Sequence, residues 1–103
     1  MYKNNRAQEV GQYNTPLEIL SRMLFRSPTG AQQEEWKGVG YLLADQRKET
    51  SYDGVMKRPK VVFATHKRDD IYVGQRLRED HIIYEIDEIV RDHEEMEMIC
   101  KRV

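Results

Sequence analysis

The second half of the chain alternates apolar and charged residues in short runs. In residues 82–90, and again in residues 96–101, apolar side chains recur at every second position over most of the run, and a charged turn over 91–95 joins the two runs. The apolar positions are Ile82, Tyr84, Ile86 and Val90 in the first run, and Met96, Met98 and Cys100 in the second. Such alternation is typical of strands with one buried face, and two alternating runs joined by a short turn indicate a β-hairpin.

Three further segments add strands to this hairpin. Residues 61–66 are apolar on both faces, which is typical of a central strand. Residues 36–45 form another strand, whose glycines predict a bulge or a bend, and residues 73–77 form a short element. In the strand over 36–45, one face carries Val39, Tyr41 and Leu43. Residues 32–35 are a polar bridge that precedes this strand.

Residues 15–27 carry two conflicting patterns. Thr15-Pro16-Leu17-Glu18 resembles a helix start, with a threonine cap and proline at the first helical position. Leu17, Ile19, Met23 and Phe25 nevertheless fall on one strand parity. Local signals therefore leave helix and strand open. Residues 27–30, Ser-Pro-Thr-Gly, predict a turn after this segment.

Size and composition limit the architecture to one modest core. A chain of 103 residues is one domain, and residues 1–14 are polar and without periodicity, as in a flexible N-terminal arm. We therefore expect a single, mainly all-β domain over residues 15–103. Its fold class is a small antiparallel β-barrel of about six strands. One long polar loop over 45–60, which could include a short helix, completes it.

The charge balance and the rare residue types exclude several functions. Charged residues make up 34% of the chain, but the formal net charge is only −1, so a general affinity for nucleic acid is not expected. The single cysteine, Cys100, excludes an internal disulfide, and its place in an alternating strand predicts a small buried side chain. No apolar run reaches the length of a membrane span, so we expect a protein made and folded in the cytosol, with no membrane partner.

No catalytic or metal site is expected. His66, His81 and His93 are too scattered to form a helical zinc motif. The paired acids at 69–70, 79–80 and 94–95 lie in turns, where carboxylates are usually exposed and therefore not tuned for acid–base chemistry. We therefore predict that the chain is not an enzyme and uses no cofactor.

From Thr29 onward, several short motifs follow one another along the chain. The motif residues are Trp36 in Glu34-Glu35-Trp36, Asp45 in Leu43-Ala44-Asp45, Asp70 after an arginine-containing turn, Gly74, Arg76 and Leu77 in a Gly-x-Arg-Leu element, Tyr84 and Ile86 in a Tyr-x-Ile strand, and Cys100 in Ile99-Cys100-Lys101-Arg102-Val103. In the order and spacing of these motifs, about three quarters of the chain resembles the head–tail joining (head-closure, stopper-type) proteins of long-tailed bacteriophages. The resemblance favours strand over helix for residues 15–27. The polar N-terminal arm and Thr15-Pro16 depart from the family pattern.

The resemblance implies a structural virion protein. Such proteins are small β-barrels that form a homo-oligomeric ring, here implied to be a dodecamer, below the phage portal and its adaptor. They receive the tail through a tail-completion protein. The implied location is the bacterial host cytoplasm during assembly and the neck of the mature virion. In some members a loop enters the channel and blocks exit of the packaged double-stranded DNA.

In this chain the matching loop is 45–60, and Lys57, Arg58 and Lys60 would then lie near DNA phosphates. An ordinary solvated loop is the other interpretation. Similarly, the Glu85/Asp87 and Lys101/Arg102 charges could form complementary ring faces or could pair across strands within one subunit.

Two other functions remain open from the sequence. One is a different connector or tail component. The other is an oligonucleotide-binding (OB)-like nucleic-acid-binding module, which needs exposed aromatic side chains on a basic groove. The aromatic candidates are Tyr41, Tyr52, Phe63, Tyr72 and Tyr84. Phe63 and Tyr84 lie among aliphatic residues and are expected in the core.

Overall fold

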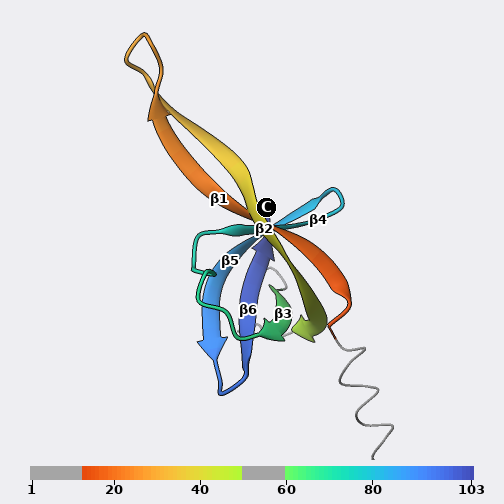
Figure 1. Cartoon of the computed structure of the whole chain (residues 1–103). Helices are drawn as coiled ribbons and strands as arrows, with labels where there is room; N and C mark the ends of the chain where they lie inside the picture. Colours follow the sequence, from red (N-terminus) through yellow and green to blue (C-terminus); the bar gives the residue numbers. More distant parts are fainter. Residues whose placement is uncertain (1–12, 50–59) are drawn as a thin grey trace, which may run out of the picture.

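The computed structural model describes residues 13–49 and 60–103, which form six antiparallel strands and no helix. In chain order these are β1 (Thr15–Arg26), β2 (Gln32–Glu49), β3 (Lys60–His66), β4 (Arg76–Glu79), β5 (Ile82–Arg91) and β6 (Glu95–Arg102). Neighbouring strands pair in the order β1-β2-β3-β6-β5-β4, and β1 also pairs with β4, which closes the sheet into a barrel (Figure 1). The predicted small antiparallel barrel of about six strands is confirmed.

One core fills the barrel, and β3 and β6 contribute much of it. Four successive β3 residues are buried, as expected for a strand that is apolar on both faces. The Phe63 ring meets the Tyr84 ring edge-on, with centroids 5.1 Å apart, an arrangement that aromatic pairs favour. The other core side chains are Leu17, Ile19, Leu42, Ala44, Ile71, Leu77, Ile86, Met96, Met98 and Cys100.

β1 is a strand throughout, so the helix alternative for its residues is wrong. The turn after it forms as predicted: the backbone N–H of Gly30 donates to the Ser27 carbonyl, and Gly30 has a φ of 90°. The polar bridge expected over 32–35 is instead the start of β2. These residues pair with the end of β1 in a hairpin that projects away from the barrel (Figure 1). Both faces of this hairpin are exposed to water, so the polar side chains of residues 32–35 stay hydrated although the backbone is a strand.

A bulge in β2 decides which of its faces points inward. Ile19 pairs with Gly40 and Leu20 pairs with Gly38, so Val39 is the extra residue. The bulge that the two glycines predict is therefore present. The face with Val39, Tyr41 and Leu43 is exposed, whereas Leu42, from the other face, joins the core. Alternation identified the two faces correctly but could not say which one covers the core.

A second bulge lies in β5 and corrects the predicted alternation. Ile86 pairs with Cys100 and Glu88 pairs with Ile99, so Asp87 is the extra residue. The bulge reverses the parity of the strand after Ile86. Ile89 therefore packs against the core, and Val90, which the pattern placed beside Tyr84 and Ile86, is 46% exposed.

The loop predicted over 45–60 begins later than expected. β2 continues to Glu49, and its last five residues pair with β3 from Lys60 to Ala64. Ion pairs made by Arg47 hold this polar stretch in the sheet. The remaining loop residues, and with them most of the segment that could include a short helix, lie outside the described residues. The predicted N-terminal arm over 1–14 also lies outside them, apart from its last two residues.

The short element expected over 73–77 is divided between a turn and β4. Gly74 has a φ of 100°, and its N–H donates to the Ile86 carbonyl. The buried side chain of Gln75 donates to the Ser21 hydroxyl and accepts from the Tyr72 N–H, both at 2.9 Å. A buried amide keeps its place when both of its polar ends are bonded. These contacts hold the connection before β4 against β1.

Candidate functional site

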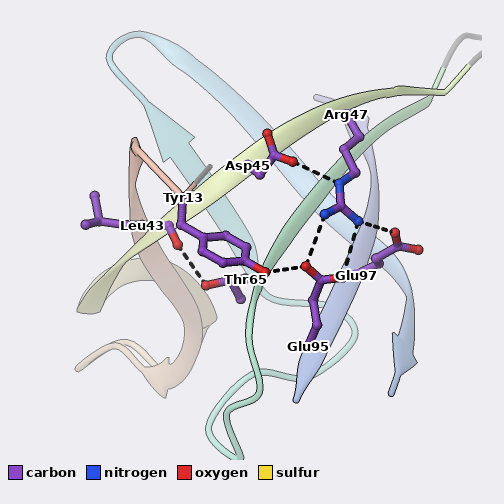
Figure 2. A network of polar contacts seen from close by, with 7 residues as sticks. All are labelled: Tyr13, Leu43, Asp45, Arg47, Thr65, Glu95 and Glu97. Carbon is purple, nitrogen blue, oxygen red and sulfur yellow. Dashed lines mark hydrogen bonds and ion pairs between the residues drawn. The ribbon is translucent and has the colours of Figure 1, made fainter. Parts of the chain in front are cut away.

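A polar network on the outside of the barrel joins β2, β6 and Tyr13, which lies two residues before β1. Arg47 donates to Asp45 at 2.9 Å, to Glu95 at 3.0 Å and to Glu97 at 2.8 Å (Figure 2). The Tyr13 hydroxyl donates to the same Glu95 carboxylate (Figure 2). One guanidinium therefore connects carboxylates that lie about fifty residues apart in the chain.

The network shifts the pKa values of three groups in consistent directions. The hydrogen bond from Tyr13 lowers the pKa of Glu95, burial opposes this, and Arg47 lowers it further. The same bond raises the pKa of Tyr13 to about 12. Burial alone would lower the pKa of Arg47, but its bonds to Glu95, Asp45 and Glu97 raise it overall. The lowered pKa of Glu95 and the raised pKa of Arg47 both favour the charged pair.

An open groove of about 1250 Å³ lies beside this network. We define the barrel groove by six of its lining residues: Tyr41, Leu43, Thr65, His66, Glu94 and Glu95. The Thr65 hydroxyl donates to the Leu43 carbonyl at 2.7 Å (Figure 2), and the His66 ring lies 4.5 Å from the Tyr13 ring between centroids. The lining is more apolar than polar. Such a hollow suits a protein side chain better than a small charged ligand.

Two of the motif residues meet at the base of the projecting hairpin. Trp36 on β2 lies under the Arg76 guanidinium, which is 4.1 Å from the ring centroid. A second Arg76 contact, 3.5 Å to Glu85, links β4 to β5. Cation–π stacking of this kind typically contributes about 0.5–1 kcal/mol at exposed sites. The pair therefore connects the hairpin to the barrel.

Four other motif residues lie in the core. Leu77, Ile86 and Cys100 are fully buried and Tyr84 almost so. Burial, with a smaller contribution from Asp87, raises the pKa of the Cys100 thiol to about 12. Burial is also the first cause of the raised pKa of Tyr84. These four residues therefore pack in the core, and none of them is accessible to a partner.

The remaining motif residues lie in connections or in the polar network. Asp70 accepts two hydrogen bonds from Arg68, at 2.9 and 2.8 Å, and these lower its pKa. Arg68 also donates to the Tyr41 carbonyl. The bend after β3 is thereby tied to β2. Asp45 belongs to the Arg47 cluster, and Gly74 forms the turn described above.

The basic residues assigned to a channel loop are only partly described. Lys60 is the first residue of β3 and is exposed. Lys57 and Arg58 lie outside the described residues. Their nearness to DNA stays a prediction.

The charges of β5 and β6 pair within one chain. Lys101 lies 3.9 Å from Asp87, and Glu85 lies opposite Lys101 in the strand register. Glu85 also contacts Arg76. This arrangement matches the cross-strand alternative and leaves these charges less available for a neighbouring subunit.

Two classes of site have no counterpart in the part of the chain that the structure describes. Over 13–49 and 60–103 no three histidine, cysteine or acidic side chains gather as metal ligands would. The same residues include no helix with the length and apolar character to cross a membrane.

Comparison with known proteins identifies the fold. The chain matches the solution structure of protein SF1141 from Shigella flexneri 2a with a TM-score of 0.72 and 18% identity. The match covers 90% of this chain and 95% of that one. A chain from the virion of a native gene transfer agent particle matches with a TM-score of 0.64 and 16% identity, covering 87% and 94%. The barrel is shared with a virion chain. No family model and no curated protein sequence matches.

Sequence reasoning missed the Arg47 cluster and the barrel groove. The residues of the cluster come from β2 and β6, which each pair with β3 and not with each other. No local pattern in the sequence signals that Arg47, Glu95 and Glu97 meet. One available signal was the parity of Asp45, Arg47 and the apolar Tyr41 and Leu43, which places all four on one face of a strand.

Proposed function

We propose that this chain is a structural protein of the phage neck that joins the portal and adaptor of the DNA-filled head to the tail. The likeness to a chain of a gene transfer agent virion over most of both lengths is the observation that carries the proposal. The order of the sequence motifs, which resembles that of head–tail joining proteins, supports it. The role is structural, without catalysis and without a cofactor.

The proposed partners follow from that position. One surface meets the portal or adaptor ring and another meets a tail-completion protein, while copies of the chain form a ring, by resemblance a dodecamer. The chain would be in the host cytoplasm during assembly and in the neck of the finished virion. The connection between β2 and β3 would face the channel and close the DNA exit, with Lys57, Arg58 and Lys60 near the DNA.

The OB-like nucleic-acid-binding alternative receives less support. Phe63 and Tyr84 are buried and cannot stack on bases. Tyr41 and Tyr72 are exposed, but Tyr41 lines a groove that also carries the acidic Glu94 and Glu95. Arg47 and Arg68 also line this groove, but both are paired with carboxylates of the same chain. A salt titration with single-stranded DNA tests this alternative, since such a module should lose affinity steeply as salt rises.

Disruption of the gene in its parent phage or prophage, with electron microscopy of the induced lysate, tests the proposed function. We expect tailless heads, many of them empty, beside complete free tails. Complementation with the intact gene should restore joined particles. Normal infectious particles from the disrupted phage would overturn the proposal.

A further inference from the structure

The projecting hairpin (residues 23–35) has little of the support that the barrel gives its other strands. Residues 23–26 of β1 and 32–35 of β2 pair only with each other, so both outer edges of this ribbon are open. Every residue of the hairpin is exposed except Ser27, which is half-buried. A two-stranded hairpin alone is at best marginally stable in water. A partner that covers it would remove this weakness.

The hairpin also presents three large apolar side chains in succession. Met23 is 45% exposed, Leu24 is 53% exposed and Phe25 is 45% exposed. Strand alternation places Leu24 on the opposite face from the other two, so apolar surface is present on both faces of the ribbon. Large apolar side chains that are exposed beside open strand edges are typical of a protein-interaction surface.

A concave counterpart lies elsewhere on the same chain. Tyr41 and Leu43 in the barrel groove are 72% and 54% exposed, and the hollow beside them is large enough for several side chains. The hairpin cannot reach the groove of its own chain. Leu43 pairs with Pro16, which lies nine residues before Phe25 on the same strand, and nine strand residues span about 30 Å.

One basic residue of the hairpin matches acidic residues of the groove, although the hairpin also carries Glu34 and Glu35 and the groove is also lined by Arg47 and Arg68. Arg26 follows Phe25 on the hairpin and is exposed. The groove carries Glu94, which is exposed, and Glu95. Three carboxylates meet at Arg47 beside the groove, so this part of the barrel has an excess of negative charge. An arginine arriving beside an apolar tip would be attracted to it.

We infer that the projecting hairpin of one copy docks in the barrel groove of a second copy. Met23 and Phe25, which share one face of the ribbon, would pack on Tyr41 and Leu43, with Arg26 at the edge of the groove beside Glu94. Because the hairpin and the groove are different surfaces, the contact is head-to-tail and generates a ring when its rotation closes. The inference rests on the proposed function for its biological setting and names the subunit contact of that ring.

Disulfide trapping of the purified full-length chain tests this contact. The variant Phe25→Cys with Leu43→Cys should give a ladder of covalent dimers, trimers and larger species under mild oxidation. A matched control, Phe25→Cys with Val103→Cys, carries its second thiol at an exposed position past the end of β6, eight residues beyond Glu95. The buried Cys100 does not compete, because its thiol is inaccessible. Equal ladders from the two variants would overturn the inference.

Mixing experiments identify the direction of the contact. Phe25→Cys protein mixed with Leu43→Cys protein should form covalent heterodimers and stop there, since each partner has one thiol of the pair. Arg26→Glu should lower the cross-linked yield several-fold, and Arg26→Glu combined with Glu94→Arg should restore it. Failure of the charge exchange to restore the cross-linked yield would also overturn the inference.

The outcomes separate this inference from the proposed function. Tailless heads after gene disruption, together with no specific ladder, would keep the neck assignment and reject the hairpin contact. A specific ladder with normal phage particles would keep the contact and reject the neck assignment.

Discussion

Single residues in this barrel owe their chemistry to partners that are distant in sequence. Cys100 shows this for burial, since its thiol is fully enclosed and its pKa is raised to about 12. Glu95 shows it for charge, since bonds from Tyr13 and Arg47 lower its pKa. Both shifts lead to measurable expectations.

The Cys100 thiol should react slowly in the folded protein. Thiolate is the reactive species, and a raised pKa leaves little of it at pH 8. We expect modification by a thiol reagent to be at least about 100-fold slower in buffer than in denaturant, because both access and ionisation are restricted. Stopped-flow absorbance measures the two rates. Comparable rates would contradict the buried position of Cys100.

Glu95→Gln should destabilise the protein in a pH-dependent way. A carboxyl whose folded pKa is lowered contributes stability above its unfolded pKa, near 4.3, and loses that contribution as the pH falls through the folded value. We expect a loss of about 1 kcal/mol at pH 7 and a smaller loss at a pH well below about 4.3, where the carboxyl becomes protonated. Denaturant unfolding at both pH values measures it. The exposed Glu88→Gln variant is the matched control and should stay within about 0.5 kcal/mol of the parent.

At the scale of elements, two one-residue bulges decide which side chains face the core. In β2 the bulge lies at Val39, and in β5 it lies at Asp87. Sequence alternation predicted the existence of both strands and the glycine-marked bulge. It assigned Val90 to the buried side, because a bulge at Asp87 carries no glycine and gives no local signal.

The β5 bulge makes a prediction that contradicts simple alternation. Ile89→Ala should cost about 1–2 kcal/mol, because Ile89 packs against the core from a half-buried position. Val90→Ala should change the unfolding free energy by less than about 0.5 kcal/mol. Chemical denaturation of the two variants compares them directly. A larger loss for Val90→Ala would place the strand in the unbulged register.

At the scale of the whole molecule, the barrel and the projecting hairpin have separate tasks. The core residues lie in the barrel, and residues 23–35 contribute none of them. Stability should therefore depend on the barrel, and assembly on the hairpin and the barrel groove. If the inferred docking occurs, a second copy covers the apolar side chains that the hairpin exposes in the single chain.

Polar substitution of the three exposed apolar residues of the projecting hairpin tests whether stability and assembly depend on different parts of the molecule. Met23→Ser, Leu24→Ser and Phe25→Ser together should change the unfolding free energy by no more than about 1 kcal/mol, since all three sites are solvent-exposed. The same variant should fail to restore joined particles to a phage with the disrupted gene. Thermal unfolding and a complementation assay measure these effects. Full complementation would show that the tip makes no essential contact.

The sequence alone determined the class of the fold, because apolar alternation, turn residues and the charged β5–β6 turn are local signals. It also determined that Cys100 is buried and that the chain after His66 turns at Asp69-Asp70. The orientation of Tyr41 and Leu43, the Arg47 cluster and the barrel groove were decided only in the tertiary structure. A single bulge reverses which side chains of a strand face the core, and no local pattern shows this reversal. The side chains of β2 and β6 meet across β3, so their contact gives no signal in the sequence near either strand. The candidate surface therefore emerges only when the barrel closes.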